Sequence, residues 1–346
     1  MKYLYDIAIL RPIIILLVVV YHAFAMYAGI WEPLEGLQSV PVYLWICKFA
    51  QGFHIEGMAF VAGYVFAFQS LNLNKRELFK SFTLKKAKRL FIPSIVFGCL
   101  YYFLFLYQSS DFQPIGFIVS LLSGVAHMWF LPMLFWCFML LWLIDRYHLS
   151  SKWLLGVLAL VSIVPIPDIP LGLGTVNHFV FYTYLGYWLY EHQSAYSAKC
   201  CRWTETTVLW IVFVVLCATD ILLFGSTMGV GAEEPLVNRL LLYLVRGALK
   251  LGFATSGILA LYNTVELVLP RVSDAAKAKW KQVSEISFGV YLCHQFILIA
   301  LYRHSMLFEA VGSYWMPWIG LLVALIGSVI ITYFAIKTKV GAFLMK

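Results

Sequence analysis

The sequence predicts an all-α membrane protein with about ten transmembrane helices and both termini in the cytoplasm. Of its 346 residues, 62% are hydrophobic and only 12% are charged, whereas a soluble domain has about 45–50% apolar and about 25% charged residues. The mean hydropathy of +0.84 is spread over the whole chain, which argues against disorder and against a soluble domain on a single anchor. We therefore expect one membrane-embedded domain over residues 1–346 and no separate soluble domain.

The apolar runs are long enough to cross a bilayer, which takes about 20 residues per helix. The first run, residues 7–29, exceeds the roughly 7–15 residues of a signal-peptide core, so we interpret it as an uncleaved first span. Segment 115–126 fits a re-entrant or interfacial piece and 153–167 is short, which leaves nine or eleven spans open. The runs after the first are approximately 43–70, 89–107, 128–144, 153–167, 176–190, 206–224, 239–268, 285–303 and 316–336.

Basic residues fall on one side of this topology, as the positive-inside rule requires of cytoplasmic loops. With the N-terminus inside, 19 of the 25 Lys and Arg residues lie in inner segments. These loops explain the net charge of +8 without a nucleic-acid partner, so we expect the lipid bilayer as the partner. The inner basic residues are Lys2, Lys75, Arg76, Lys80, Lys85, Lys86, Lys88, Arg89, Arg146, Lys152, Lys199, Arg202, Arg271, Lys277, Lys279, Lys281, Lys337, Lys339 and Lys346, and the outer acidic residues are Glu32, Glu35, Asp111, Asp168, Glu233 and Glu234.

The cysteines give no sign of a structural framework. There are seven of them, most lie inside apolar runs, and no C-x-x-C pair occurs. This pattern indicates neither a set of disulfides nor a metal knuckle, so we expect no metal ion and no permanently bound cofactor.

Ionisable side chains inside the predicted spans are candidate functional residues, because each costs at least about 2.5 kcal/mol at mid-membrane. Arg11 and His22 share one face of the first span, since eleven residues end about 20° past three helical turns and rise about 16 Å. This face fits the two ends of one long substrate. The alternative is an arginine that snorkels to the inner interface and a histidine bonded to a neighbouring helix. The other ionisable residues in the spans are Lys48, His54, Glu56, Arg246, Lys250 and His294.

His54 and Glu56 lie in an apolar stretch with small residues that permit close helix packing. A carboxylate near a histidine raises the basicity of the imidazole and fixes its tautomer, as general-base catalysis requires. The alternative is an ion pair of Glu56 with Lys48 or Arg246 that serves assembly only.

The basic run from Lys85 to Arg89 opens the third span at its inner end. Such a run usually binds anionic lipid, and it can also bind the phosphates of a nucleotide-bearing donor. Trp129 lies at the outer entrance of the fourth span, where tryptophan is typical of the membrane interface. A platform on which a sugar stacks is the alternative interpretation of Trp129.

Several separated segments resemble the membrane-bound acyltransferase-3 family of bacterial cell-envelope O-acyltransferases, in order and spacing over essentially the whole chain. The similar segments are Asp6 to His22 with Arg11, Phe53-His54 followed by Phe60-Val-Ala-Gly-Tyr64, Lys86-Ala-Lys-Arg89 with Pro93, Met128-Trp-Phe-Leu-Pro132, and Ser287-Phe-Gly-Val-Tyr-Leu-Cys-His294. The departures from the family pattern are Lys86 in place of an arginine, Glu56-Gly57 in place of Pro-Leu, and Ala62 in place of a serine.

The resemblance implies an O-acyltransferase of the bacterial cytoplasmic (inner) membrane. The co-substrate is acyl-CoA, usually acetyl-CoA, and the acceptor is a hydroxyl of an extracytoplasmic or lipid-linked carbohydrate. On this interpretation Lys86 and Arg89 bind the CoA phosphates, and Arg11 guides the donor arm along the first helix. His22 is the general base that takes the proton of the attacking hydroxyl.

The remaining residues complete this interpretation. Glu56 or His54 orients the base, and Arg246 stabilises the oxyanion or binds an acidic sugar. The expected contacts with the acceptor are His294, Trp129 and His54.

Two other classes remain as alternatives. A transporter or channel would use the buried charges as an ion or proton pathway, but the sequence lacks the inverted halves that favour it. A non-catalytic scaffold leaves the aligned Arg11 and His22 unexplained. The sequence leaves open the sugar, the position that is acylated, the acyl chain, and whether the chain forms a homo-oligomer. It also leaves open whether the acyl group passes through an acyl-histidine intermediate or the hydroxyl attacks the thioester directly.

Overall fold

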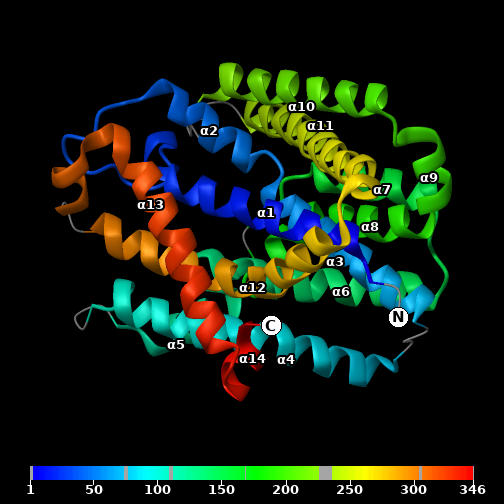
Figure 1. Cartoon of the computed structure of the whole chain (residues 1–346), viewed down its shortest axis with the longest axis horizontal. Coiled ribbons are helices and arrows are strands. Elements are labelled where there is room, and N and C mark those ends of the chain that lie inside the picture. Colours follow the sequence, from blue (N-terminus) through cyan, green and yellow to red (C-terminus); the bar gives the residue numbers. More distant parts are fainter. Residues whose placement is uncertain are drawn as a thin grey trace. The chain divides into compact units, whose positions relative to one another are not determined.

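The computed structural model describes residues 3–73, 77–108, 112–167, 169–225, 236–303 and 306–345. Within these ranges the regular secondary structure is helical and includes no strand, which confirms the predicted all-α fold (Figure 1). The chain divides into two compact units, which we call the first unit (Met1–Met58 with Ser197–Lys346) and the second unit (Ala59–Tyr196). The prediction of a single membrane-embedded domain stays a prediction.

The first unit is built around α1 (Tyr5–Ala23), the first predicted span. Ile7, Leu10, Ile14 and Val18 recur at the three- and four-residue spacing of one helix face, and all four are buried. The helices that pack against this core helix are α2 (Pro41–Gln51), α11 (Leu236–Val268), α12 (Asp274–Arg303) and α13 (Met306–Ala335).

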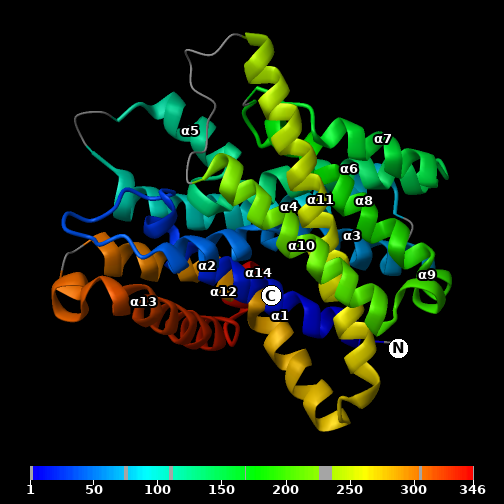
Figure 2. The ribbon, with the colours of Figure 1, turned by 90° about the horizontal axis from the view of Figure 1, so that it is seen from above.

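Helices that follow each other in the sequence also pack as neighbours in the first unit. α10 (Trp203–Phe224) lies beside α11, and α12 lies beside α13 (Figures 1 and 2). α14 (Lys339–Met345) follows α13, and α9 (Gln193–Cys200) includes the boundary at which the chain returns from the second unit. Segments from both ends of the sequence therefore meet at α1.

The predicted second span, residues 43–70, consists of two helices, because α2 ends and α3 (His54–Ala67) begins within it. A Cβ on Gly52, at the break, would lie 2.8 Å from the ring of Phe213 in α10. Glycine at this position therefore permits the close approach of α2 and α10. The break sets Glu56 in the first turn of α3.

In the second unit α3 continues and crosses α8 with the two backbones in contact. A Cβ on Gly63 would overlap the carbonyl oxygen of Thr183, and a Cβ on Gly186 would overlap that of Phe60. Glycines permit such crossings in membrane proteins. The helices of this unit after α3 are α4 (Phe79–Tyr101), α5 (Pro114–Ser123), α6 (Phe130–Arg146), α7 (Lys152–Ser162) and α8 (Val176–Glu191), with α6 packed against α4 and α8.

Seven helices in the described part of the chain are long and apolar enough to cross a membrane. They are α1, α4 with the turn that follows it, α6 with the turn before it, α10, α11, α12 and α13. The other three predicted runs are also helical, as the pair α2 and α3 and as the shorter helices α7 and α8. The chain is thus a polytopic α-helical membrane protein, while the count of about ten spans stays a prediction.

The position of both termini in the cytoplasm also stays a prediction. The residues used to orient the chain that lie outside the described residues are Lys2, Lys75, Arg76, Asp111, Asp168, Glu233, Glu234 and Lys346. The segment expected to be re-entrant or interfacial coincides with α5, a short apolar helix.

Candidate active site

The predicted base, His22, lies in the last turn of α1 and is buried, with 8% of its surface exposed. Its Nδ1 atom is 2.9 Å from the carbonyl oxygen of Val18, one turn earlier. Nε2 of His294 lies 3.1 Å from the same Nδ1 atom, and the two ring centroids are 5.0 Å apart. The packing of α1 against α12 therefore brings the two imidazoles into hydrogen-bond contact. The contact between His294 and the acceptor, which the sequence predicts, stays a prediction.

His54 is the third member of what we call the histidine cluster, His22, His54 and His294. It begins α3, it is 4% exposed, and its ring centroid lies 4.7 Å from that of Tyr21 in α1. The ring of Trp31 lies 5.7 Å, centroid to centroid, from His22. Aromatic rings thus border the imidazoles of the cluster, which reduces the access of water to them.

Glu56 is buried in the first turn of α3, with 2% of its surface exposed. Its Oε1 atom lies 3.2 Å from Nζ of Lys250 in α11. The sequence predicts Lys48 or Arg246 as the partner in a structural ion pair, and the structure places the ammonium of Lys250 beside this carboxylate. Glu56 also acts electrostatically on His54, which keeps it at the edge of the histidine cluster.

Arg246, one helical turn before Lys250 in α11, belongs to a separate charged group of the first unit. Its Nε atom lies 3.6 Å from Oδ1 of Asp220 in α10, and its guanidinium lies 5.1 Å from the ring centroid of Phe224. The ammonium of Lys48 lies in the electrostatic field of both charges. Sequence reasoning missed Asp220, although the rule that flagged the other charges in apolar runs applies equally to this residue.

Arg11 lies on the same helix as His22 and is half-buried. At the helical rise of about 1.5 Å per residue, the two residues are about 16 Å apart along the axis. Arg11 acts electrostatically on the Tyr3 hydroxyl, near the start of the chain. Lys281 of α12 places its ammonium 5.0 Å from the Tyr3 ring. α1 therefore carries a guanidinium in its first half and an imidazole in its last turn, as the first-span prediction requires.

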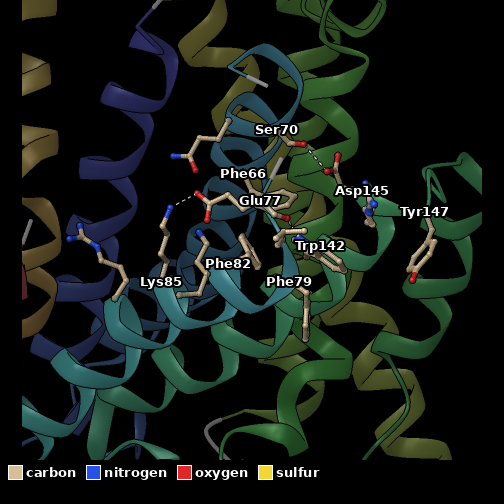
Figure 3. A pocket seen from close by; sticks show the side chains of 14 residues that line it. Phe66, Ser70, Glu77, Phe79, Phe82, Lys85, Trp142, Asp145 and Tyr147 are labelled. Carbon is tan, nitrogen blue, oxygen red and sulfur yellow. Dashed lines mark hydrogen bonds and ion pairs between the residues drawn. The ribbon is translucent and has the colours of Figure 1, made fainter. Parts of the chain in front are cut away.

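The second unit contains a cavity of about 710 Å³ at the N-terminal end of α4, which we call the basic cavity (Figure 3). Its cations include the two predicted donor-binding residues, Lys86 and Arg89. Aromatic side chains and two carboxylates form much of the remaining wall. The residues lining it are Phe66, Gln69, Ser70, Glu77, Leu78, Phe79, Phe82, Lys85, Lys86, Arg89, Trp142, Asp145, Arg146 and Tyr147.

The cations of the basic cavity differ in how they are held. Nζ of Lys85 donates a hydrogen bond of 2.6 Å to Oε1 of Glu77 (Figure 3). This ammonium holds the pKa of the Glu77 carboxyl below its usual value. Nζ of Lys86 lies 3.6 Å from the ring centroid of Phe138, which is a cation–π contact. Arg89 is exposed and lines the cavity.

Asp145, at the end of α6, anchors the wall of the basic cavity. It is 7% exposed, and its two carboxylate oxygens accept hydrogen bonds of 2.7 Å from Ser70 Oγ and 2.9 Å from the Tyr187 hydroxyl. The bond from Ser70 is visible in Figure 3. One carboxylate on α6 thus links α8 to the turn that follows α3. Sequence reasoning missed Asp145, and the available signal was an acidic residue directly after the apolar run 128–144.

Trp129 also lies in the second unit, in the short turn before α6. It is half-buried, and its ring centroid lies 5.6 Å from that of Phe179 in α8. The turn is tight because a Cβ on Gly124, whose φ is +91°, would lie 2.5 Å from the backbone of Trp129. Trp129 does not line the basic cavity among the described residues.

The apolar helices and the buried ionisable groups together define a multi-pass membrane protein with a candidate catalytic histidine. The family model described as "Acyltransferase domain" matches residues 4–337. Because this match spans nearly the whole chain, the protein belongs to that acyltransferase family, the acyltransferase-3 family that its sequence segments resemble. Searches of curated proteins and of solved structures find no match to the chain.

Proposed function

We propose that this protein transfers an acyl group, in the first instance acetyl, from cytoplasmic acyl-CoA to a hydroxyl of a cell-envelope carbohydrate in the bacterial inner membrane. The observation that carries the proposal is the basic cavity, because a membrane acyltransferase that draws on CoA needs a site for a multiply charged nucleotide. The buried His22 supplies the second requirement, a base within the apolar part of the protein.

The basic cavity suits the nucleotide end of the donor. Its volume of about 710 Å³ falls in the range of roughly 300–1,000 Å³ that small-molecule sites occupy. Lys86 and Arg89 bind the phosphates, and a guanidinium does so with paired donors where an ammonium offers a point charge. The rings of Phe79 and Trp142, whose centroids are 4.9 Å apart, provide an apolar surface for the adenine.

His22 performs the acid–base chemistry in this proposal. The acceptor hydroxyl oxygen forms a bond to the thioester carbonyl carbon, and the carbon–sulfur bond breaks. Nε2 of His22 takes the hydroxyl proton and returns it to the CoA thiolate, so the base is regenerated in each turnover. A positioned base of this kind contributes about 10²–10⁴ in rate, and the burial of His22 protects the thioester from hydrolysis.

The other charged residues take supporting roles in the proposal. Arg11 guides the donor arm, and Glu56 acts on the histidine cluster through His54. Arg246, fixed by Asp220, contacts an acidic acceptor or the oxyanion.

The test is a transfer assay with the full chain reconstituted in liposomes. Acetyl-CoA labelled in the acetyl group is supplied with an isolated cell-envelope glycan fraction, and alkali-labile label in the glycan is counted. We expect glycan acetylation by the parent protein and loss of it in His22→Ala. Parent-like turnover in His22→Ala removes His22 from the chemistry, and the absence of transfer by the parent with release of free CoA argues against a glycan acceptor.

A further inference from the structure

The hydrogen-bond partners of His294 determine where its proton lies. Its Nδ1 atom is 2.7 Å from the carbonyl oxygen of Tyr291 and 3.2 Å from that of Val290. A carbonyl oxygen only accepts hydrogen bonds, so Nδ1 must carry the hydrogen. In the neutral imidazole the Nε2 atom then has the lone pair, and this is the atom that faces His22.

The same reasoning fixes the proton of His22. Its Nδ1 atom is 2.9 Å from the carbonyl oxygen of Val18 and 3.1 Å from Nε2 of His294. Both neighbours are acceptors, so Nδ1 of His22 carries a hydrogen that it directs between them. In the opposite tautomer the lone pair on Nδ1 of His22 would face the lone pairs of the Val18 oxygen and of His294 Nε2 at these distances, which is repulsive. The lone pair of neutral His22 is therefore on Nε2.

We propose that His294 is a positioning residue that holds His22 in the Nδ1–H tautomer and presents Nε2 as the base. This inference rests on the proposed role of His22 in acyl transfer. In many hydrolases a carboxylate accepts the corresponding hydrogen bond from the catalytic imidazole. Here a second imidazole, fully buried and itself bonded to the backbone of α12, takes that place.

The pairing favours the transition state over the resting state. When His22 takes a proton on Nε2 it becomes an imidazolium, and its Nδ1–H becomes a charge-assisted donor to Nε2 of His294. Such hydrogen bonds are about twice as strong as neutral ones. Since the gain appears only as the proton moves, it lowers the barrier without tightening the binding of either substrate.

A neutral partner also suits the surroundings of the pair. The ionisable side chains around it include Tyr21, next to His22 in α1, His54 against the Tyr21 ring, and Tyr291 on the same helix as His294. In this apolar setting a carboxylate would have to be desolvated between turnovers, whereas His294 remains neutral when His22 is neutral.

The experiment compares two amides at position 294. The amide of glutamine extends to the position of the imidazole Nε2 and retains the acceptor, while the amide of asparagine reaches only as far as Nδ1. We expect His294→Asn to lower kcat about 10- to 100-fold, the factor associated with a hydrogen bond to a charged group, with KM for acetyl-CoA unchanged. We expect His294→Gln to stay within about threefold of the parent. His178→Gln in α8 is the matched control, with parent kinetics.

A second measurement reports the tautomer without activity. The reconstituted protein is labelled with ¹⁵N-histidine, and the His22 signals are assigned by their loss in His22→Gln. We expect a protonated Nδ1 and an unprotonated Nε2 in the parent and in His294→Gln, and a mixture of tautomers in His294→Asn.

The outcomes separate this inference from the proposed function. A protonated Nε2 on neutral His22 in the parent overturns the positioning role, and so does parent kcat in a folded His294→Asn. Full activity of His22→Ala overturns the proposed base, whatever tautomer the spectrum shows.

Discussion

The histidine cluster of the first unit and the basic cavity of the second unit hold their functional groups in opposite ways. His294 is fully buried and His22 is 8% exposed, and short contacts to the backbone and to each other fix both rings. In the basic cavity the Lys85 side chain is 68% exposed and forms an ion pair with Glu77. The histidine cluster thus has a fixed geometry, whereas the basic cavity presents charges on long side chains.

For the proposed function, this difference corresponds to two separate tasks. Proton transfer depends on the position of one atom to within a fraction of an ångström, and buried hydrogen bonds supply that precision. Recognition of a charged donor depends on the number of cations, and exposed lysine and arginine side chains adapt to the ligand. Variants in the two regions should therefore change different kinetic constants.

The largest effect is expected from His22→Ala. Loss of the base should lower kcat about 10²- to 10⁴-fold, the range that a positioned general base contributes. Binding of acetyl-CoA should remain, measured as protection of Lys85 from an amine-reactive label. Loss of that protection in His22→Ala would show that the two regions are not separable.

Gly63→Ala should have the next largest effect, on stability. A Cβ there would overlap the backbone of Thr183, and overpacking costs about 1–3 kcal/mol or more when backbone must move. Because α3 and α8 carry the segments that hold Asp145, donor binding should weaken as the thermal midpoint in detergent falls. Gly156→Ala in α7 is the control, since a Cβ at that position meets no atom within 4 Å, and an equal drop in both variants would contradict the crossing as the cause.

The double change of Lys86 and Arg89 to Ala should raise KM for acetyl-CoA about tenfold, equivalent to about 1.4 kcal/mol, and leave kcat nearly unchanged. The effect should shrink at high salt, because exposed charges are screened. Arg89→Lys retains the charge and loses the paired donors, so an intermediate KM is expected. An unchanged KM in the double variant would remove the donor from this cavity.

The smallest effect is expected from Glu77→Gln. The carboxylate competes with the donor for Lys85, so its loss should tighten acetyl-CoA binding about two- to fivefold, the range of an exposed ion pair. Since the pKa of Glu77 is lowered by Lys85, the ion pair forms above that pKa and is lost as the pH falls through it. Parent and variant should therefore differ at neutral pH and converge in acid, as measured by isothermal titration with acetyl-CoA.

Local patterns predicted much of the fold. Each of the ten apolar runs contains helix, because apolar length and helical spacing are properties of neighbouring residues. The break between α2 and α3 escaped prediction, and so did the close approach of Phe213 from α10 to Gly52 at this break. Periodicity along one segment holds no information about a ring that comes from a segment about 160 residues later.

The sequence by itself determined the membrane class, the first helix with Arg11 and His22, and the basic run with Lys86 and Arg89. Each of these follows from composition or from spacing within one segment. The tertiary structure decided that His294 pairs with His22 across 272 residues and that Ser70 and Tyr187 hold Asp145. Such pairings depend on which helix faces pack together, and that is set by the fit of side chains from distant segments rather than by any local pattern.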